Sequence, residues 1–244
     1  LVGSEMCIRD SDEVMKEKPN YTRYGGVSIS YADGDASYSR GSGDNHSRAM
    51  NFYVTEMGNK GHYLDVVLRF HHMDTNFKMF DENGKKIRGD MHNVGISLSS
   101  EYGRKKMIDD KGWYIEPQGQ LTLGYLGGDN YTTSNGIAVR QGGIRSALGR
   151  IGFNLGKDID EKTNIYLKAN LLHEFGGGYH AAMTDSSGSR IKIDHSFKDT
   201  WFEYGIGAAI QTGTNNHVYL DFERSAGGDF KKDWSWNVGA RWTF

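Results

Sequence analysis

The last eleven residues of the chain, from Trp234 to Phe244, alternate strictly between apolar and polar side chains. Successive side chains of a β-strand point to opposite faces, so this alternation predicts a strand with one apolar face. That face carries aromatic residues at both ends and small aliphatic residues between them, as expected where rings lie at the two interfaces of a bilayer. We therefore predict a membrane-spanning strand here, with an aromatic girdle formed by Trp234, Trp236, Trp242 and Phe244.

Composition agrees with a chain built from many strands and turns. Glycine supplies 33 of the 244 residues and proline only 2, which favours strands and turns over helices. No run of about 18 apolar residues is present, so we expect no transmembrane helix. The mean hydropathy of −0.64 is compatible with a membrane barrel, because such strands hide only every second residue in lipid.

Charge and motifs exclude several classes of function. A formal charge of −2 gives no reason to expect a nucleic-acid partner, and the single Cys7 rules out an intramolecular disulfide framework. The sequence has no G-x-S-x-G, H-E-x-x-H or C-x-x-C motif. We therefore predict no catalytic residues, no metal site and no cofactor, and a protein that is not an enzyme.

The amino-terminal segment shows neither the strand period nor the helical period. Residues 1–11 resemble translated non-native sequence, and we exclude them from fold reasoning. We expect residues 1–23 to be non-native or unstructured and residues 24–244 to form one β-barrel domain.

Period-2 alternation predicts ten strands in that domain. They lie near residues 24–33, 47–57, 61–73, 91–105, 112–126, 140–156, 163–176, 199–212, 216–225 and 233–244.

Connections between these strands alternate in length. Long ones lie at 34–46, 74–90, 127–139, 177–198 and 226–232, and short ones separate them. Outer-membrane barrels have short periplasmic turns and longer external loops. We therefore expect the long loops outside the cell and the carboxy-terminus in the periplasm.

The two faces of the predicted strands differ in charge. Apolar residues such as Phe52, Leu68, Leu98, Ile151 and Ile206 share one parity, which carries no charge in the strand interiors. The opposite parity carries eleven charged residues, namely Asp65, Arg69, Glu101, Glu116, Arg150, Lys168, Glu174, Glu203, Asp221, Glu223 and Arg241. An Arg or Lys facing lipid at mid-bilayer costs roughly 2–4 kcal/mol, so a spanning barrel requires this partition. A soluble β-sandwich that buries the apolar face is the alternative.

Three residues fit the pattern less well. Pro117 lies within a predicted strand and lacks a backbone donor, so we expect a bulge or a break in pairing there. Arg145 and Arg224 share the parity of the lipid-facing residues, but both lie near outer strand ends, where a long side chain can reach the headgroups.

Several segments together resemble the translocator barrel of autotransporters, the type V secretion proteins. They are G-W-Y-I-E-P-Q-G-Q-L-T (112–122), G-R-I-G-F (149–153), L-L-H-E-F (171–175), D-T-W-F-E-Y-G (199–205), E-R-S-A-G-G-D-F (223–230) and the final strand. The resemblance implies a twelve-stranded barrel in the outer membrane, a helix threaded through its lumen and an exported passenger. It also implies that the outer-membrane assembly machinery reads the aromatic last strand as a signal. The ten predicted strands align with the last ten of that barrel, so we expect the first two strands, the linker helix and the passenger to be absent from this chain.

The resemblance also marks candidate site residues on the lumen face. Glu116, Arg150, Glu174 and Glu203 lie within the matching segments, and with Glu101 and Arg241 we expect them to form one lumen network. Such a network would contact the threaded linker or only brace the barrel wall.

Two other functions stay open at this point. A ten-stranded outer-membrane protease of the omptin type would need Asp and His side chains to converge at the outer rim, where Asp74, Asp90, His195 and Asp199 are predicted to lie. A passive porin or adhesin barrel needs no such cluster. The sequence upstream of this chain would separate the three functions.

Overall fold

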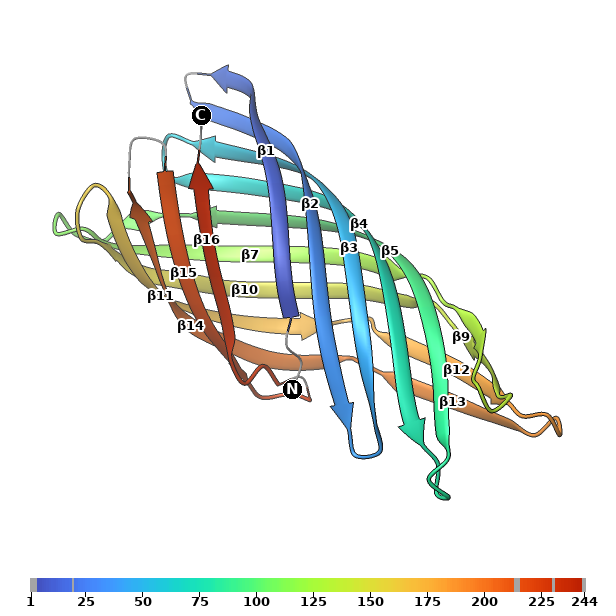
Figure 1. Ribbon diagram of the computed structural model, residues 1–244. Helices are drawn as coiled ribbons and strands as arrows, with labels where there is room; N and C mark the ends of the chain where they lie inside the picture. The colour runs from blue at the N-terminus through green and yellow to red at the C-terminus, as the bar shows by residue number, and fades with distance from the viewer. Residues whose placement is uncertain (1–3, 19, 213–215, 230, 243–244) are drawn as a thin grey trace.

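The computed structural model describes residues 4–18, 20–212, 216–229 and 231–242. Most of these residues form one strongly curled antiparallel sheet, in which each strand pairs with the strand that follows it in the same sheet (Figure 1). In order, its strands are β1 (Ser4–Lys18), β2 (Tyr21–Tyr38), β3 (Gly41–Gly58), β4 (His62–Phe80), β5 (Lys86–Arg104), β7 (Trp113–Leu126), β10 (Ile144–Asp158), β11 (Thr163–Glu174), β14 (Asp199–Gln211), β15 (Asn216–Ala226) and β16 (Ser235–Trp242). The predicted all-β, up-and-down antiparallel fold is confirmed.

The strand β1 is the main difference from the sequence prediction. We expected residues 1–23 to be non-native or unstructured, but Ser4–Lys18 is a strand that pairs along its length with β2, with one irregularity between Val14 and Lys16. Pairing uses backbone donors and acceptors, so a segment without alternation can still occupy the exposed edge of a sheet. Periodicity could not reveal such a strand.

The two edge strands, β1 and β16, do not pair with each other among the described residues. The path from β1 to β16 contains eleven antiparallel strands, so its first and last strands run in the same direction. Antiparallel closure needs an even number of strands. The first strand predicted from the alternation, near residue 24, is not an edge, because Tyr24 pairs with Val14 on one side and Thr55 on the other.

The long loops contain far more regular structure than we predicted. Residues 34–46 and 74–90 mostly extend strands, so that β2 and β3 join at a tight turn and β4 and β5 are linked by residues 81–85 only. Two of the remaining three long loops, 127–139 and 177–198, form hairpins that pair as a second sheet in the order β13-β12-β9-β8. Its strands are β8 (Asn130–Thr132), β9 (Ala138–Gln141), β12 (Gly178–Thr184) and β13 (Arg190–Ser196). Turn-forming residues mark only the tips, where Gly84, Gly136 and Gly188 have positive φ.

The short two-residue strand β6 (Lys106–Met107) marks the expected defect at Pro117. Pairing of β7 with β5 ends at Gln118, and pairing with β6 resumes at Ile115 without a change of register. On the other side, Pro117 stays in register with Phe153 of β10. The missing proline donor therefore interrupts one ladder only, and the predicted break is confirmed.

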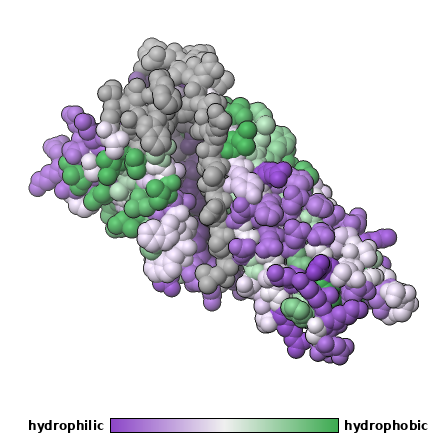
Figure 2. All heavy atoms as spheres, in the orientation of Figure 1, coloured by the Kyte–Doolittle hydropathy of each residue, from purple (hydrophilic) through white to green (hydrophobic). Residues whose placement is uncertain are grey.

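The apolar side chains form the outward surface of the curled sheet. Ile151, Trp236 and Val238 are 65%, 69% and 72% exposed, and no side chain of the described residues is fully buried. Figure 2 shows hydrophilic residues over the end that carries β9, β12 and β13, with hydrophobic residues nearer the opposite end. A soluble sandwich would bury this apolar face, so the structure contradicts that alternative. The described part of the chain contains no helix capable of crossing a membrane.

A charge placed on the outward face should prevent insertion, whereas the same charge one residue away should be tolerated. Leu98 lies outward in the apolar stretch of β5, and Ser97 points the other way. We expect Leu98→Arg to destabilise the folded barrel in vesicles by roughly 2–4 kcal/mol and Ser97→Arg to have a much smaller effect. Urea unfolding in lipid vesicles measures both, and equal losses would contradict the assignment of the two faces.

Candidate functional site

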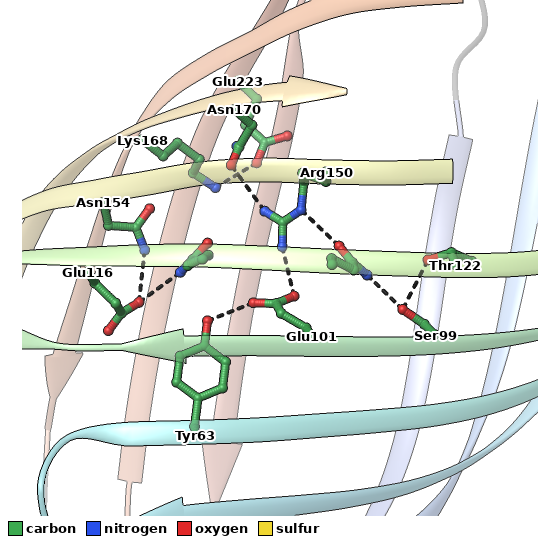
Figure 3. Close-up of polar contacts among 12 residues, drawn as sticks. Tyr63, Ser99, Glu101, Glu116, Thr122, Arg150, Asn154, Lys168, Asn170 and Glu223 are labelled. Atoms are coloured by element: carbon green, nitrogen blue, oxygen red, sulfur yellow. Dashed lines mark hydrogen bonds and ion pairs between the residues drawn. The ribbon is translucent and has the colours of Figure 1, made fainter. Parts of the chain in front are cut away.

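The inner face of the curled sheet carries a polar network centred on Arg150 of β10 (Figure 3). Its guanidinium donates to Glu101 Oε2 at 2.7 Å, to Gln120 Oε1 at 2.8 Å and to Asn170 Oδ1 at 3.2 Å. The Tyr63 hydroxyl donates to the other oxygen of Glu101 at 2.6 Å. One cation thus connects strands β5, β7, β10 and β11 and, through Glu101, also β4.

Glu116 lies on the same face but belongs to a separate group. Its Oε1 accepts from Gln118 Nε2 at 2.7 Å and from Asn154 Nδ2 at 3.1 Å. These neighbours are neutral amides, so Glu116 has no ion pair among the described residues.

A second charged cluster lies on β11, β14 and β15. Lys168 Nζ is 2.7 Å from Asp221 Oδ1 and 2.5 Å from Glu223 Oε1. Lys232, which lies just before β16, is 3.2 Å from Oε1 of Glu203 and 3.2 Å from Oε2 of Glu223. Each lysine therefore bridges two carboxylates, and because Glu223 is shared, each of the three carboxylates has a cationic partner within the wall.

Glu174 is placed differently from the other predicted residues, at the end of β11 just before the β12–β13 hairpin. It is buried and accepts from Ser146 Oγ at 2.5 Å, Ala147 N at 2.8 Å and Gly176 N at 2.7 Å. A carboxylate with three local donors holds the chain as it leaves the strand. Its contacts brace the wall.

The remaining predicted residues belong to the last strand and the residues next to it. Trp234 and Trp236 are exposed on the outward face, and their rings pack on Phe222 with centroid distances of 4.6 and 4.8 Å. The backbone of Arg241 pairs with His217 and that of Trp242 with Asn216. The side chains of Arg241 and Trp242, and all of Phe244, lie outside the described residues.

The predicted single network is thus divided. Arg150 and Glu101 come together, while Glu116, Glu174 and Glu203 have other partners. The sequence analysis did not single out Tyr63, Gln120 or Asn170 because it sorted only charged residues by face, although their parity places them with Arg150. It missed Lys232 because that residue belongs to a predicted loop.

Two charged residues of β4 are incompletely satisfied. Asp65 Oδ1 and Arg69 Nε are buried and have no hydrogen-bond partner among the described residues. Both project from the lumen face of β4, four residues apart. Unlike the charged groups on β10, β11, β14 and β15, each of these residues therefore has one polar atom without a partner in the described chain.

A row of alternating Asp and His residues crosses the outward face just beyond the apolar stretch. Asp33, His46, Asp74 and His92 are successive cross-strand partners on β2 to β5. His92 Nδ1 lies 2.7 Å from Asp74 Oδ1. This hydrogen bond raises the pKa of His92 and lowers the pKa of Asp74, and the charge attraction within the pair acts in the same directions.

This row also bears on the protease alternative. Asp74 is paired with His92, whereas the predicted His195 lies on β13, with its ring 4.7 Å from that of Phe197. Asp199 accepts from the backbone N–H of Asp229 at 2.7 Å. No group of three or more His, Cys, Asp or Glu side chains that could hold a metal occurs among the residues described.

Comparison with known proteins decides the family. The profile described as "Autotransporter beta-domain" matches residues 17–223. The chain belongs to the autotransporter β-domain family. The pertactin autotransporter of Bordetella parapertussis is 31% identical over 220 residues, covering 88% of this chain and 23% of the relative. The BrkA autotransporter of Bordetella pertussis is 26% identical over 226 residues, covering 91% and 22%.

Solved autotransporter structures share the fold. The β domain of the Bordetella autotransporter BrkA superposes with a TM-score of 0.76 at 22% identity, covering 99% of this chain and 92% of that one. The translocator domain of NalP from Neisseria meningitidis gives a TM-score of 0.73 at 13% identity, covering 99% and 82%. The chain thus spans most of these barrel domains but only about a quarter of the curated autotransporters.

The Arg150–Glu101 pair should be energetically coupled. Arg150→Gln should destabilise this autotransporter domain by about 1.5–3 kcal/mol, because it leaves a half-buried carboxylate without its cation. The double variant with Arg150→Gln and Glu101→Gln should lose less free energy of unfolding than the two single variants lose in sum. The difference, the coupling free energy, should be about 0.5–3 kcal/mol. Glu116→Gln, which removes a carboxylate not bonded to Arg150, is the matched control. Strict additivity in urea unfolding would contradict the pairing.

Removing Asp74 should change the titration of His92. Asp74→Asn should lower the pKa of His92 toward its ordinary value of about 6.5, because it removes the carboxylate that stabilises the protonated ring. The stability contributed by the protonated pair should accordingly disappear as the pH rises through the pKa of His92 in the folded protein. NMR titration of the imidazole measures the shift. As a control, Asp33→Asn should leave the pKa of His92 unchanged. A His92 pKa that stays above its ordinary value in Asp74→Asn would refute the assignment.

Proposed function

We propose that this chain is the translocator of an autotransporter, an integral outer-membrane barrel that anchors a passenger domain and exports it to the cell surface. The observation that carries this proposal is a curled antiparallel sheet with an apolar outward face and a charged lumen, in a chain of the autotransporter β-domain family. Only that distribution of side chains satisfies both lipid outside and water inside.

The proposed orientation follows from the two unlike ends of the sheet. One end carries the β4–β5 hairpin and the β8–β9 and β12–β13 hairpins, and the other carries short turns. Short turns are typical of the periplasmic side of bacterial barrels. We place the hairpins outside the cell and the carboxy-terminus in the periplasm.

The lumen face supports a route for a threaded linker. Charges on β10, β11, β14 and β15 are paired within the wall, which is a bracing role. On β4, by contrast, Asp65 Oδ1 and Arg69 Nε have no hydrogen-bond partner among the described residues. We propose that the linker leading to the passenger contacts β4 rather than the Arg150 network.

Insertion would depend on the outer-membrane assembly machinery, which we propose reads the aromatic last strand. Trp234 and Trp236 present exposed rings on the outward face of that strand. Trp242 and Phe244 continue the same parity to the end of the sequence.

We further propose that the chain itself is not an enzyme. The omptin-type protease and the passive porin or adhesin are not favoured, because the family and the matching structures are autotransporter translocators. Some relatives are named serine protease autotransporters, such as Pet of Escherichia coli, of which the match covers 17%.

Passenger display by the full-length protein tests the proposal. Intact protein should expose its passenger to protease added to whole cells, and deletion of residues 242–244 should abolish both display and the heat-modifiable barrel. Deletion of residues 186–188 at the tip of the β12–β13 hairpin is the control and should leave the barrel inserted. A correctly inserted barrel whose passenger stays in the periplasm would contradict export.

A further inference from the structure

A shallow apolar groove of about 750 Å³ runs diagonally over the outward face of β4, β5, β7 and β10. Leu68, Ile96, Leu98 and Leu123 line it, and Tyr125 and Arg145 stand at one end. The four strands extend the groove over three interstrand spacings, roughly 14 Å. It therefore has the length and surface of a seat for an acyl chain.

Register places the polar end of the groove toward the external hairpins. Arg145 is the cross-strand partner of Tyr125, and Tyr125 is the partner of Ile96. Two residues along β7, Leu123 pairs with Leu98, and Leu98 pairs with Leu68. The guanidinium thus lies where the apolar surface ends, at the level expected for lipid headgroups.

Arg145 has no compensating anion in the described chain. Its side chain is exposed and makes no hydrogen bond or ion pair with a described residue. The outward-facing Arg224, by contrast, lies 5.0 Å from the centre of the Trp234 ring. A guanidinium offers several N–H donors in a planar fork that matches a phosphate group.

We propose that this groove binds a phosphate-bearing membrane lipid. One acyl chain lies along Leu68, Ile96, Leu98 and Leu123, and the lipid phosphate accepts hydrogen bonds from Arg145. Apolar complementarity and charge complementarity point to the same molecule, whereas a free phosphate would use the guanidinium alone. The site is independent of passenger export, so it can fail while that function stands.

Native mass spectrometry of the full 244-residue chain in detergent tests the site. Dimyristoylphosphatidylglycerol is the probe, and dimyristoylglycerol is its uncharged match. The wild type should retain the phospholipid at least tenfold more than the uncharged lipid. Arg145→Gln should abolish that preference, and Arg145→Lys should keep part of it, because lysine retains the charge but not the planar fork.

Matched variants separate the groove from general surface charge. Arg48, at the same border on β3, lies near the carboxylate of Asp74, so Arg48→Gln should leave lipid retention unchanged. Leu123→Ser should lower the retention of both lipids. Heat-modifiability is checked before each measurement, so that only folded variants are compared. If Arg145→Gln does not fold, Arg145→Lys replaces it as the test of the contact between Arg145 and the lipid phosphate.

Three results would overturn the proposal. One is equal retention of both lipids by the wild type, which would leave Arg145 simply hydrated. Another is unchanged phospholipid retention in Arg145→Gln, or in Arg145→Lys a retention no different from wild type when the glutamine variant does not fold. The last is complete displacement of the lipid by millimolar inorganic phosphate, which would indicate an anion site without a role for the groove.

Discussion

Lipid supplies no hydrogen-bond donors or acceptors, so every backbone group of a membrane-spanning strand must bond to a neighbouring strand. Among the described residues, the ladder from β1 to β16 meets this requirement over most of its length, with its two edges and the position opposite Pro117 as exceptions. Because eleven antiparallel strands leave edges that run in the same direction, one more strand between them would complete the ladder. The shape of the sheet, the lumen and the sites on its two faces all depend on this backbone pairing.

Once the strands are paired, the two-residue repeat decides on which face of the sheet each side chain lies. Outward side chains such as Leu98 and Ile151 are exposed where lipid would contact them. Inward side chains such as Arg150 and Lys168 form ion pairs with side chains of other strands. Paired charges brace one part of the wall, while Asp65 and Arg69 on β4 each have a buried polar atom without a partner among the described residues. The linker contact that we propose lies on this less satisfied part of the wall.

Sequence alone could predict what depends on period 2: ten strands, the face of each charge and the defect at Pro117. It could not predict β1, because Ser4–Lys18 has no alternation and pairs through its backbone. Residues 177–198 were predicted to be a loop because the segment contains a run of turn-forming residues. That run occupies only the tip of two paired strands. The sequence prediction joined Glu116, Glu174 and Glu203 to Arg150 because parity fixes a face but not a partner, which depends on register and side-chain reach.

The central claim is that alternate residues of one strand meet lipid and water. Single nitroxide labels at residues 64 to 70 of β4, in vesicles, test it through collision with oxygen, which concentrates in lipid, and with a water-soluble nickel complex. The account predicts strong oxygen broadening at positions 64, 66, 68 and 70 and strong nickel broadening at 65, 67 and 69. A profile without this two-residue period would contradict it.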